Sequence, residues 1–515
     1  MSNAITLGHN HNTLPWLILL ICAALLSACV RTSPSDTMPW GVNSGSSTQI
    51  PASGESDNPS ITARAMGALI LSPTPDAPHP IPGMRTEPEQ YVVQSGDTLG
   101  QIAEHYNISV EDIAAASGIT DINILEVGQM LTIPVPEPVE RGPGFKIIPN
   151  SELIAGPPTV YFDVPDFVYA QNGYLVRHEE EVDGRTLSGY QIVQRVAQDY
   201  SVNARLLLAV LEYQSGWVTD SDPHTSTLKY PLGWDDPRRE GLYKQLAWAA
   251  NELNRGYYLW RVDGAGSWVL PDGAVVPANA TINAGTAGVQ QLFSKLYGQE
   301  IWERTVSEDG FFAIYYKLFG YPFDYTYEPV LPSGLKQPLM QLPFESGVDW
   351  AFTGGPHGGW GGGSAWAALD FAPYVELLGC ASSDDWIVAV ADGVIVRAAD
   401  SVVVQDLDND GVEQTGWTVL YLHVETRHRV QVGASLQAGE RIGHPSCEGG
   451  VSSGTHVHIA RRYNGEWIPA DQDIPFVLDG WVSASTGAVY EGVLQKGDRS
   501  IVADDGVTPD NVVRR

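Results

Sequence analysis

A short run near the end of the chain, 454–460, constrains the fold more than any other segment. It reads Gly-Thr-His-Val-His-Ile-Ala, with two histidines two residues apart among β-branched residues. Side chains alternate between the two faces of a β-strand, so His456 and His458 would project from the same face. Neutral imidazole is the commonest metal ligand and a common catalytic acid or base. The run therefore predicts a strand that carries a metal or catalytic site; the alternative is a pair of surface histidines that are only hydrogen-bonded.

Two upstream residues can join these histidines. His357 lies in a glycine-rich segment, 353–360, and Asp370 is a single carboxylate in an apolar, strand-like run. A buried carboxylate without a partner is unfavourable, so Asp370 should be paired or bound to a metal ion. Both residues are therefore candidate ligands.

The segment 417–424 reads as a buried strand that would place Val419, Tyr421 and His423 on one face. With it, the chain offers two histidine ligands, one aspartate ligand and a base, with room for water. Three protein ligands and one open position are typical of a catalytic zinc centre, whereas a structural zinc site has four protein ligands.

These motifs resemble the lysostaphin-type zinc endopeptidases, which cleave peptide cross-links in bacterial peptidoglycan. In most of that family the first two ligands read His-x-x-x-Asp, but here position 366 is tryptophan and His357 lies thirteen positions before Asp370. This longer, glycine-rich spacing is similar to the staphylolysin (LasA-like) branch. The resemblance covers roughly the last third of the chain.

The resemblance implies a role for each residue of the set. His357, Asp370 and His458 would hold Zn²⁺ with water in the fourth position, and His423 and His456 would be the catalytic pair. One imidazole can move a proton from water to the leaving amine, and the second can stabilise the oxyanion. Related enzymes often add an oxyanion tyrosine, for which the sequence offers two candidates, Tyr463 and Tyr490.

The start of the chain reads as an export signal. Residues 14–28 form an apolar run that is too short for a membrane span and suits a secretory signal peptide, 1–29. The run ends in Leu-Ser-Ala-Cys, which resembles a bacterial lipobox and implies lipidation of Cys29 and attachment to a membrane in the cell envelope. The segment before it lacks Lys and Arg, and the alternative is an uncleaved anchor; both export the protein.

Two cysteines remain in the exported part, Cys380 and Cys447. Export favours a disulfide between them, and two buried thiols are the alternative. The net charge of −32 argues against nucleic acid as an electrostatic partner.

Residues 30–89 are rich in Ser, Thr, Pro and Gly and are expected to form a disordered linker. Residues 90–136 then read strand, helix, helix, strand. Val-x-x-Gly-Asp-Thr-Leu at the start and Val-Gly-Gln-x-Leu-x-Ile-Pro at the end resemble a LysM domain. The resemblance implies binding of N-acetylglucosamine-containing glycan near Gly96, Asp97 and Thr98; a LysM fold without ligand is the alternative.

Residues 137–158 read as a second linker and 159–335 as a helical domain. The segment 206–216 faintly resembles the lysozyme-like fold of lytic transglycosylases, in which a catalytic glutamate precedes Ser-Gly. Here that position is Gln214, which cannot act as a general acid, and Glu212 lies about 200° around the helix from it. We expect a domain that binds glycan or acts as a spacer.

The last domain, 336–515, is expected to be mainly antiparallel β. It contains alternating carboxylates before a glycine, as in calcium loops: Asp406, Asp408 and Asp410. The loop lacks a glutamate at its twelfth position, so the calcium interpretation competes with that of an acidic hairpin tip.

Taken together, the sequence predicts a multidomain α+β protein with a βααβ LysM module, a mostly α middle domain and a β-rich peptidase domain. The predicted function is zinc-dependent hydrolysis of peptide cross-links in peptidoglycan. The alternative is a non-catalytic envelope lipoprotein that activates amidases, against which the intact set of histidines and Asp370 argues.

Overall fold

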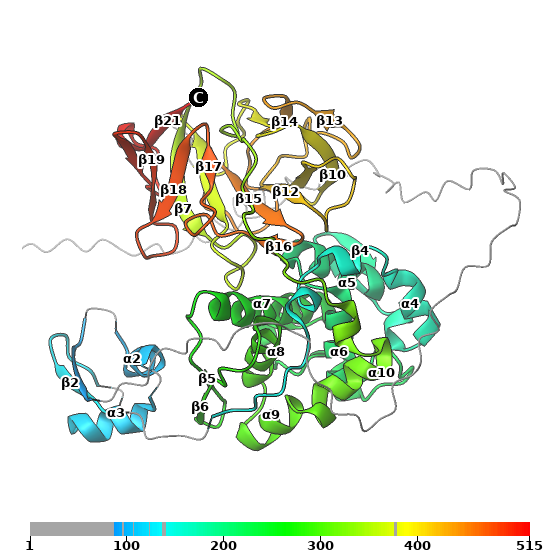
Figure 1. The fold of residues 1–515 in the computed structure, drawn as a ribbon, viewed down its shortest axis with the longest axis vertical. Helices are drawn as coiled ribbons and strands as arrows, with labels where there is room; N and C mark the ends of the chain where they lie inside the picture. Colours follow the sequence, from blue (N-terminus) through cyan, green and yellow to red (C-terminus); the bar gives the residue numbers. More distant parts are fainter. Residues whose placement is uncertain (1–86, 95–96, 107, 123, 136–140, 375–378) are drawn as a thin grey trace, which may run out of the picture. The chain divides into compact units, whose positions relative to one another are not determined.

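The computed structural model describes residues 87–94, 97–106, 108–122, 124–135, 141–374 and 379–515 (Figure 1). The predicted signal peptide with Cys29, nearly all of the 30–89 linker, and Gly96 lie outside these residues. Among the helices of the described part, none combines the length and the apolar character that a membrane crossing requires.

The N-terminal module has the predicted strand, helix, helix, strand order: β1 (Glu89–Val92), α2 (Leu99–Tyr106), α3 (Val110–Ser117) and β2 (Met130–Ile133). The two strands pair antiparallel. Ser109 caps the start of α3 through its side chain, and Gly118 ends the helix in the left-handed conformation. The module has its own small core, which includes Ile102, Ile113 and Leu131.

The middle domain is helical, as expected. Its helices are α4 (Val164–Gln171), α5 (Gly189–Tyr200), α6 (Ala204–Ser215), α7 (Leu242–Arg261), α8 (Ala284–Ser294), α9 (Gln299–Thr305) and α10 (Ala313–Phe319). Two small hairpins accompany them: β3 (Glu179–Val182) with β4 (Arg185–Ser188), and β5 (Ser267–Val269) with β6 (Val275–Pro277).

The prediction of a linker over 137–158 is wrong for the second half of this segment. Ile147, Ile148, Leu153 and Ile154 are fully buried in the core of the helical domain. Glu152 is also buried and pairs with Arg205 of α6 at 2.6 Å. The Pro and Gly residues suggested a linker, whereas the apolar residues between them make this segment part of the domain.

The structure shows what the two polar residues before Ser215 contact. The carboxylate of Glu212 accepts hydrogen bonds from the backbone N–H groups of Val218 and Thr219, at 3.2 and 3.0 Å. Its acceptors are thus used to hold the turn after α6. Gln214 instead accepts a hydrogen bond from the hydroxyl of Tyr297 at 2.7 Å.

The C-terminal domain is built on one antiparallel sheet in the order β13-β10-β11-β12-β15-β8-β7-β21, with β16 paired to β15. These strands are β7 (Asp349–His357), β8 (Ala368–Pro373), β10 (Gly393–Ala399), β11 (Val402–Asp406), β12 (Trp417–Leu422), β13 (Ser435–Leu436), β15 (Val457–Tyr463), β16 (Glu466–Trp467) and β21 (Val512–Arg514). Two smaller sheets join β9 (Ile387–Val388) with β14 (Arg441–Gly443), and β17 (Val477–Leu478), β18 (Trp481–Ser485), β19 (Gly492–Lys496) and β20 (Arg499–Val502) in sequence.

Both faces of the large sheet are buried. One face carries Val419 and Tyr421 into the core of the C-terminal domain. The alternate residues of the same strand, Leu420 and Leu422, belong to the core of the helical domain, as does Ala460 opposite Leu420. Antiparallel sheets commonly leave one face in water, but here the helical domain covers the second face.

Ion pairs accompany this apolar contact. Arg397 of β10 lies 2.6 Å from Asp199 of the helical domain and 2.9 Å from Glu413. Arg261 of α7 lies 3.0 Å from Glu466 of β16. The two domains are therefore joined by a common core with paired charges at its edge.

The predicted disulfide between Cys380 and Cys447 is present, and the Cα atoms of the two residues are 5.6 Å apart. It links the segment before β9 to the loop that precedes β15.

Replacing both cysteines by alanine is expected to lower the free energy of unfolding by about 4 kcal/mol, because the disulfide closes a loop of about 67 residues in the unfolded chain. Chemical denaturation of the oxidised protein and the double variant measures the difference. The reduced wild-type protein is the control and should match the variant; equal stability of all three would contradict the prediction.

Candidate metal centre

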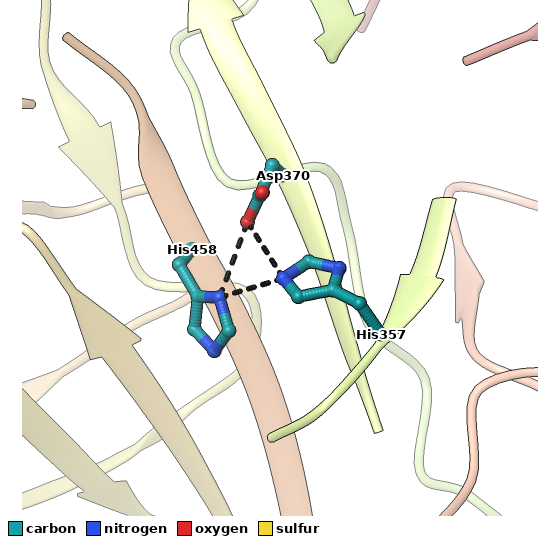
Figure 2. Close-up of side chains that lie close together, drawn as sticks. All are labelled: His357, Asp370 and His458. Atoms are coloured by element: carbon teal, nitrogen blue, oxygen red, sulfur yellow. Dashed lines mark hydrogen bonds and ion pairs between the residues drawn. The ribbon is translucent and has the colours of Figure 1, made fainter. Parts of the chain in front are cut away.

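Three neighbouring strands bring the predicted ligands together. Asp370 on β8 lies directly opposite His458 on β15, so their side chains share one face of the sheet. His357 is the last residue of β7, the strand on the other side of β8. Figure 2 shows the two imidazoles and the carboxylate converging on one point.

The distances between the three side chains suit a metal ion. Oδ1 of Asp370 lies 3.2 Å from Nε2 of His357 and 3.2 Å from Nδ1 of His458. The two nitrogens are 2.9 Å apart. Tetrahedral zinc with ligand bonds of about 2.0–2.1 Å places its ligand atoms about 3.3 Å apart. The three atoms therefore need only small shifts to hold Zn²⁺.

The second nitrogen of each imidazole is occupied. Nδ1 of His357 donates to the carbonyl of Gly355 at 2.8 Å, and Nε2 of His458 donates to the carbonyl of Gly359 at 3.1 Å. These bonds fix the tautomers, so that the nitrogens facing Asp370 carry the lone pairs. Such backbone contacts are typical of metal-binding histidines.

Electrostatics favour the ionised form of Asp370 and the neutral form of His458, which are the forms that bind a cation, but not the neutral form of His357. Burial raises the pKa of Asp370, but His357 and the other imidazoles outweigh it and hold the pKa well below its usual range. Burial lowers the pKa of His458 despite the neighbouring carboxylate. For His357, burial lowers the pKa, yet Asp370 outweighs burial and raises it overall.

A glycine makes room for the carboxylate. Gly354 on β7 lies opposite Asp370 in the pairing register, and a Cβ atom there would be 2.7 Å from Oδ2 of Asp370. A larger residue would force the carboxylate away from the two imidazoles.

The other two histidines lie beside the candidate ligands. The rings of His423 and His456 are 4.5 Å apart, and Nε2 of His456 is 3.8 Å from Oδ2 of Asp370. Burial and the neighbouring His456 lower the pKa of His423 to about 4. The imidazole of His423 is therefore neutral near pH 7.

The shared face predicted for Val419, Tyr421 and His423 is wrong for the histidine. Val419 and Tyr421 point into the core of the C-terminal domain, on the face opposite His458. His423 follows the end of β12 with a φ of 66°, which breaks the alternation. This left-handed residue turns its ring toward His456, and strand periodicity alone could not anticipate that.

The structure distinguishes the two candidate tyrosines. The ring of Tyr490 stacks on His357 with centroids 4.2 Å apart, and its carbonyl accepts the N–H of Gly355 at 2.7 Å. Tyr463 packs on Trp417, with centroids 5.4 Å apart. Only Tyr490 contacts one of the candidate ligands.

The remaining predicted site residues lie elsewhere. In the N-terminal module, Asp97 accepts hydrogen bonds from the N–H of Gln94 and the hydroxyl of Tyr91, both at 2.7 Å. Thr98 accepts a bond from the N–H of Gln101 at the start of α2. Both side chains thus shape the first turn of the module, and their contact with glycan stays a prediction.

The acidic loop does gather its carboxylates. Asp406, Asp408 and Asp410 each offer an oxygen within 4.8 Å of the others. Asp406 is fully buried and accepts the backbone N–H groups of Asp408 and Gly411. Desolvation and the adjacent Asp406 raise the pKa of Asp408 to about 7.

Comparison with protein families agrees with the site. Residues 379–470 match peptidase family M23, and this range includes His423, His456 and His458. This chain carries an M23 peptidase domain. His357 and Asp370 lie upstream of the matched range.

Residues 91–134 match the LysM domain and 146–330 match the N-terminal domain of LasA, so the predicted LysM module is confirmed. The lysozyme-like fold of the middle domain stays a prediction.

Curated relatives support the M23 assignment. Protease LasA of Pseudomonas aeruginosa is 27% identical over 287 residues, which cover 52% of this chain and 65% of LasA. Beta-lytic metalloendopeptidase of Achromobacter lyticus is 26% identical over 170 residues, or 32% of this chain and 41% of that protein. The chain thus spans about two thirds or less of the length of these relatives. Among solved structures, the M23 metalloprotease pseudoalterin is 23% identical, with a TM-score of 0.27, and the match covers 33% of this chain and 96% of that one.

Proposed function

We propose that this protein is a zinc-dependent endopeptidase that cleaves peptide cross-links of bacterial peptidoglycan. The observation that carries the proposal is the convergence of His357, Asp370 and His458 at 2.9–3.2 Å, with two further histidines beside them. Relatives named as protease and metalloendopeptidase support the same reaction class.

Zinc held by these three residues would polarise the scissile carbonyl and lower the pKa of a bound water molecule. His423, neutral near pH 7, and His456 lie where one imidazole can accept a proton from the attacking water and return it to the leaving amine. Tyr490, beside His357, is the better placed of the two tyrosines to donate a hydrogen bond to the oxyanion.

The LysM domain supports targeting to the glycan strands of the same polymer. We further propose that the exported protein is attached to an envelope membrane through lipid on Cys29, as the lipobox-like run before it suggests. The competing function, activation of amidases without catalysis, needs none of the five residues of the site.

The decisive experiment uses the full chain. Bound zinc is measured in the purified protein, which is then incubated with peptidoglycan beside a His458→Ala variant. One zinc per chain and new peptide termini only with the parent protein would support the proposal. Zinc-free protein that leaves peptidoglycan intact but stimulates an amidase would establish the regulator instead.

The acidic loop is proposed to bind Ca²⁺ through Asp406, Asp408 and Asp410. Because Asp408 must lose its proton to bind, affinity should rise with pH and fall up to about tenfold per unit below pH 7. Calorimetric titration with calcium at pH 6 and pH 8 measures the effect. An Asp408→Asn variant should bind calcium more weakly at both pH values. If the parent protein bound no calcium at pH 8, the loop would instead be interpreted as an acidic hairpin tip.

A further inference from the structure

The loop between the first two candidate ligands, 358–367, contributes directly to the third. The carbonyl of Gly359 accepts the Nε2–H of His458, which leaves Nδ1 facing Asp370. Gly359 is held in turn by its own N–H, which donates to the carbonyl of Ala365 at 3.0 Å. The position of this loop therefore sets both the direction of His357 and the tautomer of His458.

Helix α7 of the helical domain holds the far side of the loop. The N–H of Gly363 donates to Oδ1 of Asn251 at 2.8 Å. The backbones of the loop and the helix lie so close that a Cβ atom on Gly363 would overlap the backbone oxygen of Asn251. A Cβ on Gly361 would lie 2.9 Å from Oδ1 of the same residue. Asn251 thus contacts the loop at Gly361 and Gly363.

The helical domain also reaches Gly359 indirectly, through Trp467 of β16. The backbone of Gly359 packs on the indole of Trp467, where a Cβ would lie 2.5 Å from the ring. That indole donates its N–H to the carbonyl of Tyr200, at the end of α5, at 3.2 Å. The backbone N–H of Trp467 donates to the hydroxyl of Tyr258 on α7 at 2.9 Å.

We infer that the helical domain is a working part of the metal centre, and that Asn251 is a positioning residue for it. Asn251 does not touch the candidate ligands. It fixes the glycine loop, whose Gly359 carbonyl orients His458 and whose first residue follows His357. The inference rests on the proposed zinc site. It assigns to the middle domain a role in the peptidase reaction rather than a separate role as spacer or glycan binder.

The test compares Asn251→Ala with Asn251→Asp in the full chain. Readouts are the zinc dissociation constant from competition with a chelator, the visible spectrum of the cobalt-substituted protein, and peptidoglycan cleavage. Loss of partners that orient metal ligands weakens binding about 10–100-fold, and we expect an effect in this range for Asn251→Ala. Asn251→Asp keeps the accepting oxygen and should restore zinc affinity and the cobalt spectrum.

The matched control is Arg185→Ala, which removes an ion pair with Asp400 between the same two domains but does not touch the loop. It should leave zinc affinity and the spectrum unchanged. Gly363→Ala is the second variant, since it displaces the loop while Asn251 is intact, and it should act in the same direction as Asn251→Ala. It decides the matter if Asn251→Ala does not fold.

Parent-like zinc affinity and cobalt spectrum in both Asn251→Ala and Gly363→Ala would overturn the inference while leaving the zinc site intact. An equal change in Arg185→Ala would also overturn it, because the effect would then belong to domain association in general. A parent protein that binds no zinc would overturn the proposed function, and the inference with it.

Discussion

Asp370→Asn is expected to leave the protein folded, to remove zinc during dialysis, and to lower peptidoglycan cleavage about 1000-fold or more. Asparagine has nearly the same shape, but it is neutral and presents an amide that binds zinc weakly. Oδ1 of Asp370 contacts both imidazoles, so its charge is central to the site. Loss of about 4 kcal/mol of transition-state stabilisation corresponds to the stated factor.

Metal analysis and the release of peptide termini measure this effect. The control is Asp498→Asn, which neutralises an exposed carboxylate of the same domain and should behave as the parent. Full zinc occupancy and parental cleavage by Asp370→Asn would contradict the assignment of the ligand.

Trp467→Ala is expected to give the largest loss of stability. The side chain is fully buried in the core shared by the helical domain and the sheet. Truncation of a buried tryptophan costs about 3–5 kcal/mol. The unfolding temperature of this joined unit should therefore drop clearly.

Calorimetry of the full chain resolves the effect, because the LysM module has its own core and its transition should stay unchanged. Trp386→Ala serves as the control, since this tryptophan is only partly buried and packs on His444. If Trp467→Ala affected the joined unit no more than Trp386→Ala does, the shared core would contribute little.

Local sequence patterns predicted much of the site. Residues two apart on a strand share a face, which identified His456 and His458 as a pair. The energetic cost of burying Asp370 alone indicated that it needed partners. In the N-terminal module, the alternation of strand and helix patterns was sufficient to predict the element order that the structure shows.

Long-range contacts were not predictable in this way. Continuous apolar strands such as 417–422 indicate burial on both faces, but they do not reveal what covers the second face. The contact of Asn251 with Gly363 joins residues 112 positions apart, and no spacing rule reaches that far. The direction of His423 depends on one residue with positive φ. Pro and Gly near 142–158 gave the appearance of a linker, although Leu153 and Ile154 are core residues.

The pairing of β7, β8 and β15 is complete without any ion, because every strand of the site has neighbours on both edges and packed layers above and below. We therefore expect the proposed zinc ion to bind without any change of fold. A chelator should abolish peptidoglycan cleavage while the circular dichroism spectrum of the protein stays the same. Added zinc should restore cleavage within the time of mixing, without any refolding step. The zinc-free protein would stay folded but inactive. Its activity would then rise and fall with the zinc concentration around the cell wall.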